Sequence, residues 1–542
     1  MSGFVVCPQV PAAEVAVDVL RSGGNAVDAA VSAAFVQGVT DPLMCGLGGY
    51  GVMLVHDAAT RTETVIDFFS RAPAGVREGS YGEALMREFH YDYGYVLADG
   101  SNEIGYQSIG IPGTVAGLAL ALERFGTIDW QAAVEHAARV ADAGLAVTPA
   151  MHQHWQATEG PDKPATLDRL TASEGARAMF LRDGRPLRAG EVIDCTDYAR
   201  TLRRLAAAGA ADFYRGEIAA AISENFAANG ALVTGDDLAA YQPAVVTPLT
   251  GSYRGLGLVV PPFPSGGLTM LEALNVLELE FGGPLPEWPS AASISGVARA
   301  LGRAVQDKMR YLAGPREDGA QPPVDMLISK EYARRIHDGR PGPVTAAPQR
   351  AGTGREAADT THIVVADAAG NAVSLTHTLA SGSGVITPGL GFMFNDFMHG
   401  FDPRPGRWNS LRPHATRPAS NCPTFVKDDD GRLVAVAGAT GSTRIVSSLV
   451  QVLSHVIDRG WDPDRVVSAA RINCQRGSLI QMEARVASSE VAGLEEEGWQ
   501  VERHLGNYEP YFGRAYLLCR NGDDEWRGAA DPRGGGGIVL TA

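Results

Sequence analysis

The chain has 542 residues, of which 45% are hydrophobic and 20% are charged, so it is long enough to bury a large core and has the composition of a soluble globular protein. Its formal net charge of −16 argues against nucleic acid or an anionic membrane surface as the main partner. The six cysteines form no CxxC pair, and we identify neither a secretory leader nor a membrane-spanning run. We therefore expect reduced thiols and a cytoplasmic protein.

The first 130 residues predict two helices, two strands and a third helix. Helical spacing of small apolar residues over 12–38 is broken at Gly23-Gly24, which marks the end of one helix and the approach to the next. Buried strands joined by a polar turn are expected at 50–57 and 62–69, and a helix at 110–126. From 128 to 340 helical patterns dominate, the clearest being 129–144, 198–210, 215–230 and 268–282.

The pattern changes after residue 340. Residues 340–358 hold three prolines, three glycines and no periodic apolar face, which is typical of a linker. Two β-rich runs, 361–367 and 372–379, follow around a turn, and a third at 433–439 leads into a helix over 443–460. Because strand-forming runs come from both ends of the chain, we expect sheets inside and helical layers outside.

Three motifs that suggest cofactor, metal or serine chemistry have a simpler explanation. "GLGGYG" at 46–51 matches GxGxxG, but a helix precedes it and a strand follows, whereas a dinucleotide site needs the reverse order. His152 and His154 have no carboxylate or cysteine at ligand spacing, so two solvated histidines are favoured over a metal site. "SGSGV" at 381–385 lacks the GxSxG nucleophile pattern. The sequence therefore predicts neither a cofactor nor a metal ion.

The first β-rich run after the linker begins with two threonines, Thr360-Thr361. Threonine is a weak nucleophile unless a base removes its proton, and an N-terminal threonine can use its own α-amino group, whose ordinary pKa is about 7.7–8.0. A threonine in mid-chain gains that amine only if the peptide bond before it is cut, and its own hydroxyl can make this cut through an ester. Taken alone, a threonine pair at a strand start usually reflects β-propensity.

Eight ordered segments favour the catalytic interpretation, and together they span nearly the whole chain. They are "SGGNAVDAAVSAAF", "GIPGTVAGLALALERFGT", "DFYRGEIA", "PPFPSGGLTMLEALNVLE", "TTHIVVADAAGNAVSLTHTL", "RPASNCPTFV", "GATGSTRIVSSLVQVL" and "GAADPR". In order and spacing they resemble gamma-glutamyltransferases. The resemblance implies an α+β fold, a four-layer αββα sandwich of the N-terminal nucleophile hydrolase type. It also implies a precursor that cuts itself before Thr360 into a large chain, 1–359, and a small chain, 360–542, which remain one co-folded unit.

The same resemblance assigns catalytic residues. It implies Thr360 as the nucleophile and Thr378 as the threonine that hydrogen-bonds the nucleophile's hydroxyl, and a hairpin makes this plausible because residues near its two strand ends lie opposite each other. Gly441 and Ser442 match the pair whose backbone N–H groups form the oxyanion hole. They lie just before a predicted helix, where N–H groups lack intrahelical partners and can hold developing negative charge.

The residues that recognise glutamate mostly depart from the family pattern. Phe69 replaces the arginine that grips the α-carboxylate, although Arg71 lies two residues on, and His399 replaces the acid that binds the α-ammonium. Ser420-Asn421 and Ala380 also differ from the family residues at their positions. Losing both charged contacts removes two bonds of about 1.5–3 kcal/mol each, so we expect poor binding of γ-glutamyl groups. The residues expected to contact substrate are Phe69, Arg71, Asn395, His399, Ser420 and Asn421.

We therefore expect a self-processing amidohydrolase or acylase that acts on a small-molecule amide. The segment 401–418 carries four arginines and one acid, so it is either a site for a carboxylate-bearing acyl group or a solvated surface loop; the arginines are Arg404, Arg407, Arg412 and Arg417. Three alternatives stay open: a γ-glutamyl transferase or hydrolase for glutathione-type substrates, a C–C bond hydrolase of specialised metabolism, and an unprocessed binding protein. The resemblance also implies a homodimer of processed units, and neither nucleic acid nor a membrane is expected as a partner.

Overall fold

The computed structural model describes residues 3–81, 84–88, 94–156, 164–283, 285–316, 321–338, 360–474, 477–520, 525–533 and 537–542. The predicted linker, 340–358, lies outside these described residues. Thr360 is the first residue described after it, so of the expected cut site only the threonine side of the bond is visible.

Two antiparallel sheets form the centre of the molecule. In the first sheet the strand order is β10 (Ala244–Val246), β3 (Thr62–Phe68), β2 (Tyr50–Asp57), β14 (Ala372–Thr378), β13 (Thr361–Ala366), β1 (Phe4–Cys7) and β22 (Ile538–Thr541). In the second it is β11 (Leu249–Tyr253), β12 (Leu256–Val260), β15 (Thr424–Lys427), β16 (Leu433–Thr440), β20 (Arg514–Arg520) and β21 (Trp526–Ala530).

Both faces of the first sheet are buried, and the side-chain alternation of its strands explains why. In β2, Val52 and Leu54 belong to the core between the two sheets, whereas Met53 and Val55 belong to the core under the helices. Successive residues of a strand point to opposite faces, so a continuous apolar run such as this one fills two cores at once. The predicted hairpin at 361–379 lies in the middle of this sheet, with Thr361 paired to His377.

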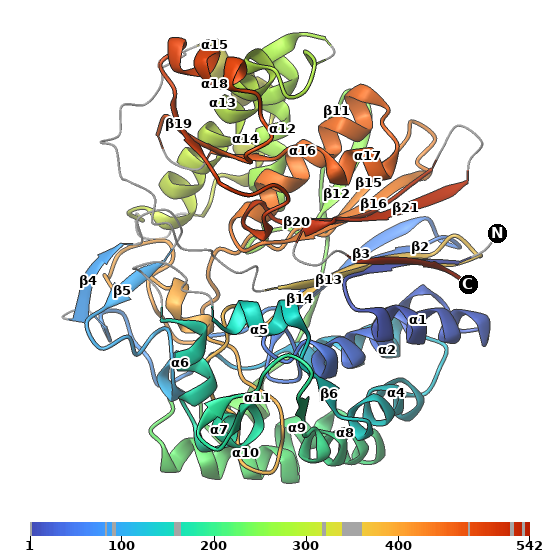
Figure 1. The fold of residues 1–542 in the computed structure, drawn as a ribbon, viewed down its shortest axis with the longest axis vertical. Helices are drawn as coiled ribbons and strands as arrows, with labels where there is room; N and C mark the ends of the chain where they lie inside the picture. The colour runs from blue at the N-terminus through green and yellow to red at the C-terminus, as the bar shows by residue number, and fades with distance from the viewer. Residues whose placement is uncertain are drawn as a thin grey trace.

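Helices cover the outer face of each sheet (Figure 1). The first sheet is covered by α1 (Val10–Arg21), α2 (Ala26–Thr40), α3 (Thr114–Phe125), α4 (Trp130–Asp142) and α8 (Thr196–Ala208). The second is covered by α12 (Gly267–Phe281), α13 (Ala291–Lys308), α16 (Arg444–Arg459), α17 (Pro463–Ser468) and α18 (Ser488–Glu496). The layers therefore run helix, sheet, sheet, helix, which confirms the predicted α+β sandwich.

The remaining elements form the periphery. Helices there are α5 (Pro149–Trp155), α6 (Thr166–Thr171), α7 (Glu174–Phe180), α9 (Ala211–Arg215), α10 (Glu217–Ala228), α11 (Gly235–Ala240), α14 (Val324–Leu327) and α15 (Lys330–Asp338), with short helical turns η2 (Tyr106–Ser108), η3 (Met309–Ala313), η4 (Phe397–Gly400) and η5 (Pro510–Phe512). Short strands there are β4 (Leu85–Glu88), β5 (Tyr95–Leu97), β6 (Leu145–Ala146), β7 (Leu181–Arg182), β8 (Arg185–Pro186), β9 (Val192–Ile193), β17 (Ile472–Asn473), β18 (Leu479–Met482) and β19 (Gln500–Arg503).

The structure departs from the sequence prediction between residues 128 and 340. Helices dominate there as expected, but β10, β11 and β12 also belong to the two central sheets. These strands were missed because β11 and β12 contain glycines and little clear alternation, and β10 has only three residues. Among the described helices, none is long and apolar enough to cross a bilayer, and all six cysteines are buried and outside any disulfide.

Candidate active site

The β13–β14 hairpin brings two threonine hydroxyls together at its open end. Thr360 Oγ1 lies 3.3 Å from Thr378 Oγ1, the contact that the family resemblance implied. The backbone N–H of Ala380 donates to Thr378 Oγ1 at 2.8 Å. A hydroxyl has one proton and two acceptor lone pairs, so an oxygen that accepts this N–H can still direct its proton at Thr360. Thr360 itself is only 5% exposed, yet its side chain reaches a pocket.

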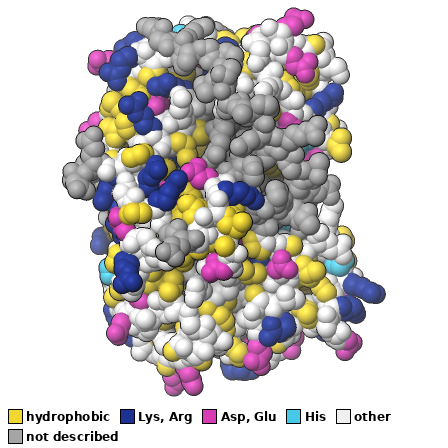
Figure 2. All heavy atoms as spheres, turned by 90° about the vertical axis from the view of Figure 1, so that its left-hand side faces the viewer, with side chains coloured by type: hydrophobic (Ala, Val, Ile, Leu, Met, Phe, Trp, Pro, Cys, Tyr) yellow, Lys and Arg dark blue, Asp and Glu magenta, His cyan; other side chains and the backbone are white. Residues whose placement is uncertain are grey.

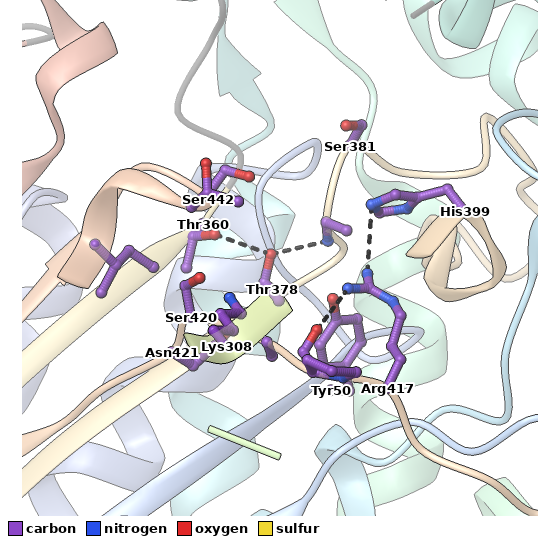
Figure 3. Close-up of a pocket in the computed structure, with 15 residues that line it drawn as sticks. Tyr50, Lys308, Thr360, Thr378, Ser381, His399, Arg417, Ser420, Asn421 and Ser442 are labelled. Atoms are coloured by element: carbon purple, nitrogen blue, oxygen red, sulfur yellow. Dashed lines mark hydrogen bonds between the residues drawn. The ribbon is translucent and has the colours of Figure 1, made fainter. Parts of the chain in front are cut away.

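The pocket draws its lining from two strands of the first sheet, from α13 and α16, and from several loops (Figure 3). Ser442 lies beside Thr360 in this view, and His399 and Arg417 lie on the other side of Thr378. The lining residues are Tyr50, Lys308, Thr360, Thr378, Ala380, Ser381, His399, Arg417, Pro418, Ala419, Ser420, Asn421, Ser442, Thr443 and Ile445. Segments more than 300 residues apart in the chain therefore meet at one hydroxyl.

A tight turn between β16 and α16 forms the wall next to Thr360. Gly441 has a φ of +129°, and a Cβ atom there would lie 2.7 Å from the Cα atom of Gly513, so only glycine fits. Ser442 follows with a φ of +54°. Among the hydrogen bonds of the described residues, none is donated by the backbone N–H groups of Gly441 or Ser442. Two N–H groups at the start of a helix and beside a pocket suit a developing negative charge.

His399 and Arg417 form the opposite wall. The Nδ1 atom of His399 lies 2.7 Å from the backbone oxygen of Asp396 and must carry a proton to bond it. The Nε2 atom then accepts from Arg417 Nη2 at 3.4 Å, since a guanidinium can only donate. His399 thus connects the Asp396 backbone to the Arg417 guanidinium.

Behind His399 lies a buried charge cluster. Arg169, on α6, pairs with Asp396 at 3.2 Å and with Glu103 at 3.5 Å. Glu103, Asp396 and His399 offer ligand atoms close enough together to hold a metal ion. The Arg169 guanidinium, however, already bonds both carboxylates, and a second cation would meet repulsion. We therefore interpret the cluster as a support for the Asp396–His399 loop.

Two further histidines lie inside the hairpin, away from the pocket. His362 contacts the hydroxyls of Thr376 at 2.9 Å and Ser374 at 3.1 Å, and His377 contacts Gln37 at 2.9 Å. Burial lowers the pKa of each imidazole to about 3, because a charged ring loses its hydration there. Both rings are therefore neutral near pH 7 and hold the hairpin to its neighbours by uncharged hydrogen bonds.

Three predicted substrate contacts do not line the pocket. Phe69 is fully buried between the sheets against Tyr50, because it continues the inward-facing side of β3. Arg71 bonds Asp67 at 3.1 Å and is turned back onto its own segment. Asn395 is fully buried and donates to the backbone oxygens of Gly48 and Gly110, so it holds two loops together. His399, Ser420 and Asn421 do line it, as do all predicted catalytic residues except Gly441, whose neighbour Ser442 does.

The four arginines of segment 401–418 have different surroundings. Arg404 pairs with Asp402 and Glu88, and Arg412 pairs with Glu78. Arg407 is outside the pocket lining, whereas Arg417 belongs to it. The sequence alone does not distinguish these four arginines, because spacing within a loop does not show which side chain turns inward.

Several pocket residues were not predicted from the sequence, among them Tyr50 and Lys308. Tyr50 begins β2 directly after a glycine pair, and its ring packs edge-on against Phe397 with centroids 4.9 Å apart. Lys308 is the last residue of α13, where lysine is common for its interaction with the helix dipole. The glycine pair is a signal for Tyr50 in the sequence, because two adjacent glycines can mark a place where backbone segments pack closely. In the structure, Cβ atoms at Gly48 and Gly49 would collide with neighbouring backbone. For Lys308 the sequence offered no signal.

Comparison with known proteins decides the family. The model of the gamma-glutamyltranspeptidase family matches residues 12–541. This chain belongs to that family. Glutathione hydrolase proenzyme of Pseudomonas sp. strain A14 is 31% identical, with 99% of this chain and 94% of that protein covered. Acylase ACY 1 proenzyme of Pseudomonas sp. strain V22 is 34% identical, with 92% and 87% covered.

A solved structure agrees with this membership. The crystal structure of cephalosporin acylase from Bacillus halodurans matches with a TM-score of 0.85 and 26% identity, over 99% of this chain and 95% of that one. The family expected from the eight sequence segments is thus confirmed, and with it the N-terminal nucleophile hydrolase fold. The gamma-glutamyltranspeptidase family consists of enzymes that include both hydrolases and acylases, so this chain is an enzyme of the amidohydrolase and acylase type.

Proposed function

We propose that this protein is a self-processing amidohydrolase whose nucleophile is the hydroxyl of Thr360. The observation that carries the proposal is the position of that hydroxyl, 3.3 Å from Thr378 and facing a pocket at the first described residue after the predicted linker. A threonine at a strand start that only served β-structure would need neither a second hydroxyl beside it nor access to a pocket.

The proposed reaction uses groups already present at the site. Cutting the bond before Thr360 converts its backbone nitrogen into a free amine, which takes the hydroxyl proton as the oxygen attacks an amide carbonyl. The carbonyl oxygen gains negative charge facing the N–H groups of Gly441 and Ser442. Each of these donors can lower the activation free energy by about 3 kcal/mol. The C–N bond then breaks, the amine product leaves with the proton, and water hydrolyses the Thr360 ester.

We further propose that the acyl group is not γ-glutamyl. An ammonium group needs a carboxylate or several acceptors nearby, and no Asp or Glu occurs among the described residues lining the pocket. The acylase relative supports this reading, whereas the glutathione hydrolase relative of similar identity keeps a γ-glutamyl hydrolase as the second candidate. Turnover of γ-glutamyl 4-nitroanilide as fast as that of other acyl anilides would favour the second candidate.

The first prediction concerns processing by Thr360. Thr360→Ala removes the attacking oxygen, so we expect a single full-length band in denaturing gels and no measurable amide hydrolysis. The wild type should give two bands, the smaller beginning Thr-Thr-His by N-terminal sequencing. Thr250→Ala, at an exposed threonine on β11, is the matched control and should be processed normally. A Thr360→Ala protein that is still cut before residue 360 would contradict the assignment.

A further inference from the structure

Arg514, the first residue of β20, contacts the proposed nucleophile from outside the pocket lining. Its Nη2 donates to the backbone oxygen of Thr360 at 3.5 Å, and its Nε donates to Thr440 Oγ1 at 3.1 Å. Arg514 and Thr440 are direct partners in the pairing of β16 with β20, so the strand register sets this contact. Arg514 therefore reaches the nucleophile's own residue without lining the space that a substrate fills.

The same side chain connects two parts of the proposed catalytic machinery. Thr440 is the last residue of β16 and comes directly before Gly441 and Ser442, the residues of the proposed oxyanion hole. The donors of a guanidinium form a rigid planar fork, so one arginine can fix the distance between two acceptors. Arg514 is thus placed to hold the Thr360 backbone at a set distance from the end of β16 and the turn that follows.

The charge of Arg514 acts on the proposed base as well. A guanidinium stays charged at any working pH, and Arg514 is only 9% exposed. The backbone nitrogen and oxygen of one residue lie less than about 4 Å apart, which places this charge within about 8 Å of the Thr360 nitrogen. A positive charge at that distance, away from water, disfavours protonation of an amine and lowers its pKa by about 1–2.

Other cations near Thr360 lie on the pocket side. Lys308 and Arg417 line the pocket, and Figure 3 shows Arg417 beside His399, on the other side of Thr378 from the nucleophile. Surface charges add little: on the face shown in Figure 2, acidic and basic side chains are interspersed, and salt screens exposed charges over about 10 Å. Arg514 is thus the cation that is bonded to Thr360 itself.

The acid that faces Arg514 is Asp41. Gln9 Nε2 donates to Asp41 Oδ2 at 2.9 Å and to Thr361 Oγ1 at 3.1 Å, so one amide separates this acid from the start of β13. Burial raises the pKa of Asp41, whereas the Gln9 hydrogen bond and the Arg514 charge lower it. Burial also raises the pKa of two further side chains around β13 and lowers that of two others, so all four are uncharged near pH 7: Cys7 and Tyr516, and His362 and His377.

We propose that Arg514 is a positioning residue for the nucleophile: it ties Thr360 to the oxyanion turn, and its charge keeps the new α-amino group unprotonated at neutral pH. The inference rests on the proposed function, because this amine exists only after the chain is cut before Thr360. An ordinary α-amino group has a pKa of about 7.7–8.0 and is mostly protonated at pH 7. Only the neutral amine can take the proton from Thr360 Oγ1 as that oxygen bonds the acyl carbon, and it then passes the proton to the leaving amine.

Brief acetylation of the processed protein tests the amine directly, because acetic anhydride modifies an amine only when it is unprotonated. Mass spectrometry of the N-terminal peptide of the 360–542 fragment gives the modified fraction from pH 5 to 9. We expect half-maximal modification of the wild type at about pH 6–7, below the ordinary 7.7–8.0. Arg514→Gln should raise this midpoint by about 1–2 pH units, whereas Arg514→Lys, which restores a charge, should keep it near the wild-type value.

Arg520→Gln is the matched control. Arg520 lies at the other end of β20, about 20 Å along the strand, and donates to the backbone oxygen of Leu433 at 3.0 Å. This variant should keep the wild-type midpoint. The acid limb of kcat/KM should move together with the midpoint in each variant, measured with butyryl or γ-glutamyl 4-nitroanilide, whichever the wild type hydrolyses. If Arg514 served packing alone, Arg514→Gln would lower the rate at every pH and leave the limb in place.

A wild-type midpoint at pH 8 or above would overturn the proposal, and this measurement needs no variant. An unchanged midpoint in Arg514→Gln, or an equal rise in Arg514→Lys, would overturn it as well. If the midpoints behave as expected but neither anilide is hydrolysed, the reaction assignment fails and the role of Arg514 stands. If an anilide is hydrolysed while Arg514→Gln leaves the midpoint unchanged, the role of Arg514 fails and the nucleophile stands. A chain that is never cut before Thr360 would overturn both.

Discussion

Two residues beside the nucleophile adopt a backbone conformation that their side chains disfavour. Ala380 has a φ of +57° and Ser442 a φ of +54°, and both line the pocket. This left-handed conformation costs a residue with a Cβ atom about 1–2 kcal/mol. At Ala380 it turns the backbone N–H onto the Thr378 hydroxyl. Strain at these positions is what orients two of the polar groups around Thr360.

The second prediction follows from Ala380. Glycine removes the Cβ strain but loses about 0.5–1 kcal/mol of backbone entropy, so Ala380→Gly should be more stable by up to about 1 kcal/mol in urea unfolding. Ala372→Gly is the matched control, because Ala372 is buried in β14 and does not have a positive φ. The Ala372→Gly variant should have a free energy of unfolding about 1 kcal/mol lower than the wild type. An equal decrease in the free energy of unfolding in both variants would show that the backbone at Ala380 is not strained.

At the scale of elements, the β13–β14 hairpin makes stability depend on pH. His362 and His377 have a pKa of about 3 when folded and about 6.5 in an unfolded chain, so between these values the unfolded state binds more protons. Their contribution to stability is therefore complete above about pH 6.5 and is lost as the pH falls toward 3.

The third prediction is the size of that loss. The free energy of unfolding should fall by about 1.4 kcal/mol per histidine for each pH unit below about 6.5. Urea unfolding at pH 7, 6 and 5 measures it. His377→Asn should reduce the slope by about half, whereas the same change at the exposed His414 should leave it as in the wild type. A stability that is flat from pH 7 to 5 would contradict neutral burial of the two rings.

A second element-scale feature is a fully buried ion cluster beneath the start of β20. Asp531 pairs with Arg471 at 3.0 Å and with Arg533 at 2.9 Å, and Arg533 also pairs with Glu483 at 2.8 Å. Asp531 additionally accepts the backbone N–H of Ala515. Because β20 pairs with the end of β16, this cluster supports the strand from which the Gly441 turn leaves.

The fourth prediction tests the cluster. Asp531→Asn keeps the side-chain shape but leaves two buried arginines with one acid, which should cost about 3–5 kcal/mol in chemical unfolding. Asp428→Asn breaks the partly exposed Asp428–Arg432 pair and should cost less than about 1 kcal/mol. A loss at Asp531 no larger than that at Asp428 would mean that the buried charges are compensated elsewhere.

At the scale of the whole molecule, the two expected chains are interleaved. In the first sheet, β13 and β14 of the expected small chain lie between β2 and β1 of the expected large chain. In the second, β12 of the expected large chain pairs with β15 of the expected small one. Separating the chains would break the centre of both sheets and open the core between them.

The fifth prediction is that cleavage does not release either chain. The two fragments should elute together in size-exclusion chromatography and unfold in one transition, because they share one core. Adding denaturant above the unfolding midpoint should be the condition that separates them. Elution of a free 360–542 fragment from native protein would contradict the co-folded arrangement.

Sequence patterns predicted the parts of this structure that depend on neighbouring residues. The β13–β14 hairpin and the turn from β16 into α16 lie within short stretches, so strand pairing and helix-start signals fix them locally, and the family resemblance then implied the Thr360–Thr378 contact. The short strand β10 and the glycine-containing β11 and β12 were not predictable in the same way. They are strands because the sheet edges offer them partners, and a partner is not visible in local spacing.

The sequence by itself determined the family, the layered fold and the threonine pair, since eight ordered segments and strand periodicity are properties of the linear chain. Only the tertiary structure decided which side chains meet Thr360. It brought in Tyr50, Lys308 and Arg417, and it left Phe69 and Arg71 outside. The physical reason is that a pocket is made where loops from distant segments converge, and the direction of a loop side chain depends on what packs against it rather than on its spacing.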